Sequence, residues 1–356
     1  MAVRSAFPAH RYPQDELAGA YAAIATGLRP AQRMLVERLY ANAEVATRHT
    51  VLPVGEYAAL AEASDQGAAP ANDRYITEAT ALGERALRSA LASAGLAASE
   101  VDLLIVTSVT GVAVPSLDAR LIPRLGLRPD IKRLPVFGLG CVAGAAGLAR
   151  LHDYLLAWPG HVAALLAVEL CTLTVPWTKV TTADLVASAL FGDGAAAVVA
   201  AGEMAGRKAP ARLPQVIATR SEVYPDSTDT LGWRLGADGF RIVLTAELAE
   251  VVERRLNGSV TAFLGEHGLT VDDIGSWICH PGGPKVLDAA QRALKLPDSA
   301  MAASRRSLSE AGNMSSVSVL HILELTADGE RPPPGTFGVM IGLGPGVSVE
   351  LLLLRW

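Results

Sequence analysis

Three residues far apart in the sequence, Cys141, His280 and Asn313, carry side chains that together could perform acyl transfer. An imidazole next to a thiol holds or accepts the thiol proton, so a Cys–His pair makes a nucleophile near neutral pH. An amide N–H beside an imidazole N–H forms a two-donor site for a developing enolate or tetrahedral oxyanion. Each residue also has a purely structural interpretation. Cys141 could be a buried structural cysteine, His280 a core or surface histidine, and Asn313 a helix N-cap.

The segment around Cys141 predicts a strand that turns sharply into a helix. An apolar run over residues 134–137 is followed by Gly138 and Gly140, and small residues then continue to Leu148. We expect both the strand and the helix to be buried, with Cys141 at the helix N-terminus. The free N–H groups and the dipole at that end favour a thiolate, so the sequence predicts a lowered pKa for Cys141.

His280 precedes the turn Pro281-Gly282-Gly283-Pro284, which we expect just past the end of a strand. Sites in α/β proteins lie at such strand ends. The neighbouring Cys279 should point to the opposite face, so a Cys/His metal pair is not expected there. Cys171 has no comparable flanking residues, and we assign it to the core.

An internal repeat indicates how these residues come together. A helix pattern at 76–94 leads through Gly-Leu into a strand at 102–107, and a helix pattern at 248–267 leads through Gly-Leu into a strand at 275–280. Each strand is followed by a turn and helix, with Cys141 in the first copy and Asn313 in the second. The strand ends and the following turns recur at offsets of 173 (280 − 107) and 172 (313 − 141) residues, and each copy closes with a Gly-x-Gly turn and a strand. The repeat predicts two copies of one βαβ-type unit around a pseudo-twofold axis, facing one crevice.

The composition argues against a nucleic-acid-binding, secreted or membrane-spanning protein. The chain has 356 residues, half of them apolar, and a formal net charge of −5, so no basic surface for nucleic acid is expected. The three cysteines form no disulfide framework and suit a reducing cytoplasm. No secretion signal is recognised, and the apolar runs are too short to span a bilayer. We therefore expect a cytoplasmic protein.

The pattern along the chain predicts an α/β fold of sheets covered by helices. Residues 13–45 are expected to be helical, with a turn near 27–30. Buried strands are expected at 101–107, 162–168, 194–201, 337–342 and 347–354, and loops at 62–74, 202–213 and 327–335. We place the domain boundary between residues 205 and 206, giving an N-terminal half with Cys141 and a C-terminal half with His280 and Asn313.

The motifs FGLGCVAG, ALFGDGAAAV, WICHPGGP, EAGNMSS and GLGPGVSVE, which extend from residue 137 to residue 350, resemble those of the type III polyketide synthases. This chalcone-synthase-like family belongs to the thiolase superfamily, and the resemblance spans the chain from about Pro30 onward. It implies a thiolase-like fold with a layered α/β/α/β/α core, and a homodimer with the loop 111–115 at its interface. No metal or redox cofactor is implied.

The resemblance also implies a role for each matching residue. Cys141 would accept a starter from an acyl-CoA, while His280 and Asn313 would stabilise the enolate formed by decarboxylation of malonyl-CoA. Phe191 matches the gatekeeper between the coenzyme A tunnel and the cavity. The other implied substrate-binding residues are Val109, Thr110, Thr174, Ile242, Ser315, Leu343, Gly344 and Pro345.

Departures from the family pattern bear on the substrate. Leu343 replaces a phenylalanine, and only Arg38 remains of the basic residues that grip coenzyme A, with Lys285 as a candidate replacement. Modest side chains at the cavity positions favour an aliphatic acyl-CoA starter, extended to an alkylpyrone or alkylresorcinol. The alternatives are a single condensation as in β-ketoacyl synthase III, possibly on a carrier protein, and a malonyl-only synthesis of tetrahydroxynaphthalene. A catalytically inactive binding protein on the same fold is a further alternative.

Overall fold

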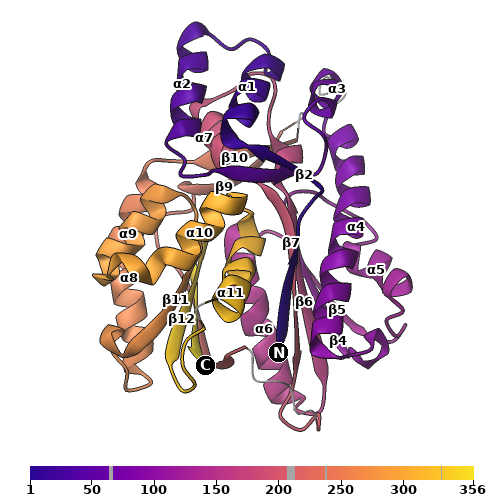
Figure 1. Ribbon diagram of the computed structural model, residues 1–356, viewed down its shortest axis with the longest axis vertical. Helices are drawn as coiled ribbons and strands as arrows, with labels where there is room; N and C mark the ends of the chain where they lie inside the picture. Colours follow the sequence, from indigo (N-terminus) through magenta and orange to yellow (C-terminus); the bar gives the residue numbers. More distant parts are fainter. Residues whose placement is uncertain (64–66, 207–212, 237–238, 330) are drawn as a thin grey trace.

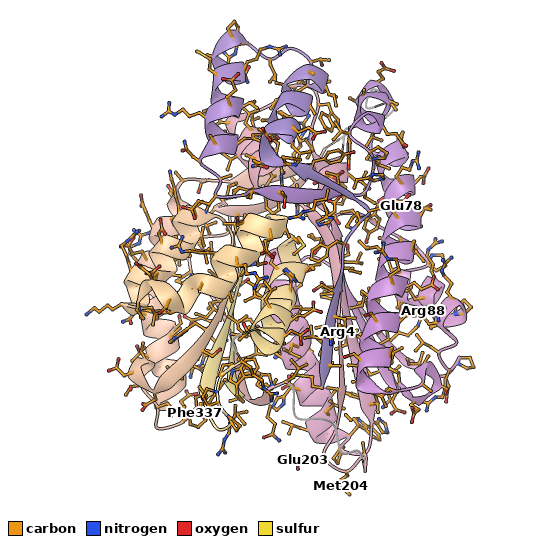
Figure 2. All side chains as sticks on the ribbon, viewed as in Figure 1. Arg4, Glu78, Arg88, Glu203, Met204 and Phe337 are labelled. Carbon is orange, nitrogen blue, oxygen red and sulfur yellow. The ribbon has the colours of Figure 1, made fainter. Side chains whose placement is uncertain are left out.

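The computed structural model describes residues 1–63, 67–206, 213–236, 239–329 and 331–356. Figure 1 shows two sheets standing side by side, with a smaller group of helices and short strands above them. The turn after the first sheet, which carries Glu203 and Met204, lies at the end of the molecule opposite this upper group (Figure 2).

The first sheet has five strands in the order β1-β7-β6-β4-β5. They are β1 (Ala2–Ala6), β4 (Leu103–Thr107), β5 (Lys132–Val136), β6 (Val162–Leu170) and β7 (Asp193–Ala201). β4 is parallel to β5 and β6, whereas β7 is antiparallel to both β6 and β1.

The second sheet has four strands in the order β11-β12-β13-β8. They are β8 (Gln215–Val223), β11 (Ile274–Cys279), β12 (Phe337–Gly344) and β13 (Ser348–Arg355). β11 is parallel to β12, and β13 is antiparallel to β12 and to β8.

The two sheets confirm the internal repeat. When β1, β7, β6 and β4 are matched to β8, β13, β12 and β11, both the order and the orientation of the strands agree. Within the described residues, β5 has no counterpart in the second sheet. The predicted boundary at residues 205 and 206 falls in the connection between β7 and β8, and we keep it as a proposal.

Helices cover and separate the sheets in the predicted five-layer arrangement (Figure 1). The central layer is α6 (Ala143–Ala157) and α11 (Ser318–Asp328), which pack against each other and against strands of both sheets. The first sheet is covered outside by α4 (Ala69–Ala94) and α5 (Leu117–Leu125). The second sheet is flanked by α8 (Glu247–Gly265), α9 (Pro284–Leu294) and α10 (Ala302–Ala311).

The upper group in Figure 1 covers the end of the sheets where β11 and β4 finish. It contains α1 (Gln14–Ile24), α2 (Pro30–Ala41), α3 (Glu56–Glu62) and α7 (Thr182–Leu190). Its strands pair as β2 (His10–Pro13) with β3 (Thr47–Thr50), and β9 (Leu231–Gly236) with β10 (Gly239–Leu244).

Two local expectations need correction. The strand before Cys141 is not buried: β5 is exposed along most of its length, because it is an edge strand that pairs only with β4. The predicted loop at 62–74 ends early, since α4 begins at Ala69 with Pro70 in its first turn, where the missing N–H costs nothing. Part of the predicted loop at 202–213 lies outside the described residues.

Candidate active site

Cys141 lies in the connection between strand β5 of the first sheet and helix α6 of the central layer. It is the middle residue of a short 3-10 turn, Gly140–Val142, that runs directly into α6. The loop after β12 closes over this turn. A β-carbon on Gly344 would come within 2.7 Å of the Val142 nitrogen, and one on Gly140 within 2.8 Å of the Pro345 ring. Gly344 and Pro345, both predicted as site residues, therefore pack directly on the turn that carries the thiol.

Asn313 occupies the corresponding place in the second half, before the 3-10 turn Ser315–Val317 and α11. Its side-chain oxygen accepts a hydrogen bond from the Ser315 N–H at 2.8 Å, and its side-chain nitrogen donates to the Gly282 carbonyl at 3.3 Å. Its backbone pairs with Phe191 in an isolated bridge between the two halves. The predicted gatekeeper and the predicted enolate donor are thus neighbours.

His280 follows the last residue of β11, and its N–H donates to the Ile341 carbonyl at 2.9 Å. Its imidazole is buried, and Nδ1 has no hydrogen-bond partner among the described residues. Burial lowers the pKa of His280 to about 3, so the ring is neutral. A neutral imidazole keeps one N–H to donate and one nitrogen to accept a proton.

A series of hydrogen bonds links Cys141 and Asn313 and reaches the turn that follows His280. The Cys141 thiol is hydrogen-bonded to Ser315, Ser315 to Asn313, and Asn313 to the Gly282 carbonyl, two residues after His280. Ser315 has a positive φ of 49°, an uncommon conformation for a residue with a side chain. The turn at Ser315 therefore brings its hydroxyl to the thiol while its N–H holds Asn313.

The electrostatics contradict the predicted thiolate. Burial raises the pKa of Cys141 to about 12, and the nearby Glu169 charge adds to this rise. The hydrogen bond from Ser315 acts in the opposite direction but does not compensate. The helix N-terminus was the basis of the prediction, and desolvation of the charged sulfur outweighs it. The raised pKa of Cys141 and the lowered pKa of His280 favour a protonated thiol and a neutral imidazole at neutral pH.

Glu169 is the residue that the sequence analysis missed. It is fully buried near the end of β6, and its carboxylate accepts hydrogen bonds from Val109 N–H, from the hydroxyls of Thr110 and Ser316, and more weakly from Ser108 and Ser315. Burial raises the pKa of Glu169 to about 7. Its signal in the sequence is one charged residue within the apolar run 162–170.

The Glu169 contacts also place two predicted cavity residues. Val109 and Thr110 are buried and hydrogen-bonded to this carboxylate, from the segment that follows β4. Thr110 and Thr174 line a cavity of about 310 Å³ together with Val112, Trp177 and Phe240. Ile242, two residues after Phe240 on β10, is half-buried and lies opposite Trp233 in the β9–β10 hairpin.

Leu343 is a core residue of β12, with 3% of its surface exposed. It fills the place of the expected phenylalanine without opening the β12 core to solvent. Cys171, which the sequence assigned to the core, is buried. Burial raises the pKa of its thiol, and the nearby charges of Glu169 and Cys141 raise this pKa further.

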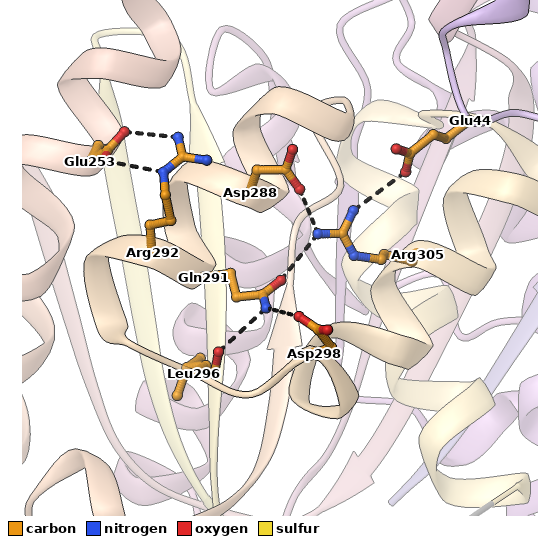
Figure 3. Close-up of polar contacts among 8 residues, drawn as sticks. All are labelled: Glu44, Glu253, Asp288, Gln291, Arg292, Leu296, Asp298 and Arg305. Atoms are coloured by element: carbon orange, nitrogen blue, oxygen red, sulfur yellow. Dashed lines mark hydrogen bonds and ion pairs between the residues drawn. The ribbon is translucent and has the colours of Figure 1, made fainter.

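Within the described residues, no hydrogen bond or ion pair joins Arg38 or Lys285, the two predicted coenzyme A residues, to Cys141, His280 or Asn313. Arg38 lies in the last turn of α2 and Lys285 in the first turn of α9. Helix α9 is held on its outer side by a network of ion pairs and hydrogen bonds: Arg292 binds Glu253 of α8, while Arg305 of α10 binds Asp288, Gln291 and Glu44 (Figure 3). The coenzyme A roles of Arg38 and Lys285 stay predictions.

In the described part of the chain, no three or more His, Cys, Asp or Glu side chains are grouped so that they could hold a metal ion. No described helix is both long enough and apolar enough to cross a membrane.

Comparison with known proteins gives consistent matches over the whole chain. Residues 1–203 match the family model for the N-terminal domain of chalcone and stilbene synthases, and residues 215–356 match that for the C-terminal domain. A 1,3,6,8-tetrahydroxynaphthalene synthase of Streptomyces peucetius is 54% identical over 100% of this chain and 92% of its own length. An alpha-pyrone synthesis polyketide synthase-like protein of Mycobacterium tuberculosis is 30% identical over 92% of this chain and 83% of its own.

Solved structures agree with these matches. The crystal structure of 1,3,6,8-tetrahydroxynaphthalene synthase from Streptomyces coelicolor has a TM-score of 0.90 and 31% identity, covering 100% of this chain and 98% of that one. A polyketide synthase from the brown alga Ectocarpus siliculosus has a TM-score of 0.91 and 27% identity, covering 99% and 97%.

Proposed function

Because the chain belongs to the chalcone and stilbene synthase family of type III polyketide synthases, we propose that Cys141, His280 and Asn313 are its catalytic residues. Enzymes of this family use coenzyme A thioesters and catalyse decarboxylative Claisen condensation. The observation that supports the assignment is the chain of contacts that joins the Cys141 thiol, Ser315, Asn313 and the turn after His280 at the meeting point of the two halves.

In the loading step, Cys141 sulfur attacks the carbonyl carbon of an acyl-CoA. The new C–S bond forms as the bond from the carbonyl to the coenzyme A sulfur breaks. Since both residues are neutral, the thiol proton passes to His280 during the attack and then to the departing coenzyme A sulfur. No net proton is taken up or released in this step.

In the condensation step, malonyl-CoA loses carbon dioxide, and the electron pair of the broken C–C bond forms an enolate. The His280 N–H and the Asn313 amide donate hydrogen bonds to the enolate oxygen. Its carbon then attacks the Cys141 thioester, the C–S bond breaks, and the released sulfur takes up one proton. Phe191 and the cavity residues confine the growing chain before it cyclises.

For the product, we propose that malonyl-CoA serves as both starter and extender and that the chain makes 1,3,6,8-tetrahydroxynaphthalene. The 54% identity to a synthase of that name over this entire chain supports the proposal. Incubation with malonyl-CoA alone, without a carrier protein, should then give tetrahydroxynaphthalene in a mass-spectrometric product analysis. Absence of any product without an added acyl-CoA would refute it.

A second candidate, the aliphatic starter, is favoured by the cavity beside Thr110 and Thr174. If an alkyl chain enters it, product yield should rise with acyl length, because each buried methylene contributes about 0.8 kcal/mol. Thr174→Trp should then shift preference to short starters. Under the malonyl-only proposal, no added acyl-CoA should be incorporated, and the same substitution should leave starter choice unchanged.

We propose that the protein works as a homodimer that covers the open edge of the first sheet. β5 leaves one row of backbone groups unpaired, and Val114, Phe137 and Leu139 nearby are 89%, 57% and 41% exposed. Exposed apolar side chains beside an open strand edge mark an association surface. Light scattering should give twice the monomer mass, and Val114→Glu should reduce it.

The free cysteines and the coenzyme A thioester substrates support a cytoplasmic location, which we also propose. Cell fractionation with an antibody against the protein would test it, and recovery in the membrane or secreted fraction would refute it.

A further inference from the structure

One buried cation, Arg48, has no role in the steps above. It lies on β3, and 4% of its surface is exposed. Its guanidinium group donates to the Gln14 side chain at 2.9 Å and to the carbonyls of Ser188 and Phe191 at 2.7 and 2.6 Å. The Tyr40 ring lies 5.3 Å from it on another side. Holding a charge away from water is costly, so a buried arginine with this many defined partners is a specific feature.

The acceptors of Arg48 form the end of helix α7. The last carbonyls of a helix have no partners within the helix and carry the negative end of its dipole. Arg48 binds two of them, and Gln14, itself held by Arg48, donates to a third, the Ala189 carbonyl, at 2.7 Å. Arg48 and Gln14 together therefore fix where α7 ends.

The segment that leaves α7 carries the gatekeeper and holds the enolate donor. The Leu190 carbonyl accepts from the Asn313 N–H at 2.8 Å, and the Gly192 N–H donates to the Asn313 carbonyl at 3.0 Å. Phe191 lies between these two bonds. The backbone of residues 190–192 is thus bound by Arg48 and Gln14 on one side and by Asn313 on the other.

The carbon chain of Arg48 also contacts the turn of Asn313 directly. A β-carbon on Gly312 would lie 2.9 Å from the Arg48 Cδ, and Gly312 has a positive φ of 71°. Arg48 therefore contacts both sides of the Phe191–Asn313 bridge. Its guanidinium binds the end of α7 and Phe191, and its methylene groups pack against the turn at Gly312.

We propose that Arg48 is a positioning residue for decarboxylation, which sets Asn313 and Phe191 relative to each other from outside the cavity. The inference rests on the enolate role proposed for Asn313. A displacement of about 1 Å in a catalytic group can lower a rate about 10²-fold. Cys141 is held by the 3-10 turn before α6 and by the packing of Gly344 and Pro345 on that turn, and it is linked to Asn313 through Ser315 alone among the contacts described above. Loss of Arg48 should therefore affect decarboxylation much more than starter loading.

The test compares both half-reactions in Arg48→Lys, which keeps the charge but cannot bridge two carbonyls and a side chain. Malonyl-CoA decarboxylation should fall about 10²-fold in kcat, while acylation of Cys141, followed by mass spectrometry, should stay within about threefold. Arg128→Lys is the control, because Arg128 likewise binds more than one partner, Asp102 and Asp130, but lies after α5. It should change neither half-reaction.

A double variant separates a positioning role from loss of structure. If Arg48 acts through Asn313, the pair Arg48→Lys with Asn313→Ala should decarboxylate no more slowly than Asn313→Ala alone. Equal losses in both half-reactions, or losses that multiply in the double variant, would overturn the inference. If Arg48→Lys does not fold, Gln14→Ala removes one α7 contact and should give a smaller loss in the same direction.

These results also separate the inference from the proposed function. Full decarboxylation by Asn313→Ala would refute the enolate role itself. A large loss in Asn313→Ala with none in Arg48→Lys would refute only the role of Arg48.

Discussion

The turns at Cys141 and Asn313 come from corresponding places in two copies of one unit, yet they have become chemically different. Each lies before a helix of the central layer, but the Cys141 turn follows strand β5, whereas Asn313 follows helix α10. The first turn presents a thiol whose pKa is raised by burial. The second presents an amide whose donor and acceptor atoms are both hydrogen-bonded in the free enzyme.

This difference indicates how duplication of one structural unit can produce two chemically different positions. The duplicated fold brings the N-termini of α6 and α11 to one crevice, and the residues at each N-terminus can change independently. The helix N-terminus alone does not make Cys141 reactive, since desolvation outweighs it. In the mechanism proposed above, Cys141 of the first half acts together with His280 and Ser315 of the second, so that mechanism requires both halves. The halves also differ at their edges, because among the described residues only the first sheet has the additional strand β5.

The largest expected effect comes from removing the nucleophile. Cys141→Ala should abolish all chain extension, because no sulfur remains to carry the acyl group. Malonyl-CoA decarboxylation should remain measurable, since the donors from the second half are intact. Extended products from this variant in a mass-spectrometric assay would show that another residue carries the chain.

A second prediction concerns how the Glu169 carboxylate affects the thiol. Glu169→Gln removes an anion that raises the pKa of Cys141, so that pKa should fall. Alkylation of Cys141 by iodoacetamide should become faster, by up to about tenfold for one pKa unit. The gain should appear above pH 7, where Glu169 is ionised, and vanish at lower pH, where it is already neutral.

Glu350→Gln is the matched control, because Glu350 is another buried glutamate, on β13, that is bound by Ser221. It should not change the alkylation rate. Slower alkylation in Glu169→Gln would mean that Glu169 supports the thiolate, against this account. Peptide mapping must show the label on Cys141, which is the most exposed of the three buried cysteines at 9%.

The smallest effect is expected at the proposed coenzyme A contact. Lys285→Ala should raise KM for malonyl-CoA a few-fold without changing kcat, as expected for an interaction present equally in ground and transition states. The effect should shrink at high salt, because exposed charges are screened over about 10 Å at 0.1 M. Lys295→Ala, at the other end of α9, is the control. An unchanged KM would make Lys285 an ordinary surface lysine.

Much of the fold was predictable because strand length and repeat order depend on local sequence. The predicted helix at 248–267 and the predicted strands at 102–107 and 275–280 end within two residues of α8, β4 and β11, whereas α4 begins at Ala69, seven residues before the predicted start at 76. The exposure of β5 was not predictable, because a strand's place in the sheet depends on long-range pairing rather than on its own residues.

The site was predictable in its residue types but not in its electrostatics. Motifs identified Cys141, His280 and Asn313, and the repeat placed two of them at equivalent turns. The pKa values depend on how much water is excluded, which local sequence does not report. Glu169 and Arg48 were missed for the same reason, since a charged residue in a sequence shows neither its burial nor its partners.

In the proposed mechanism the two copies divide the work: the first carries the acyl chain, and the second stabilises the enolate. Asn313→Ala tests it most directly, with decarboxylation of malonyl-CoA and acylation of Cys141 measured on the same preparation. Decarboxylation should fall on the order of 10²–10³-fold while acylation changes little. Loss of acylation as severe as in His280→Ala would contradict the division between the two halves.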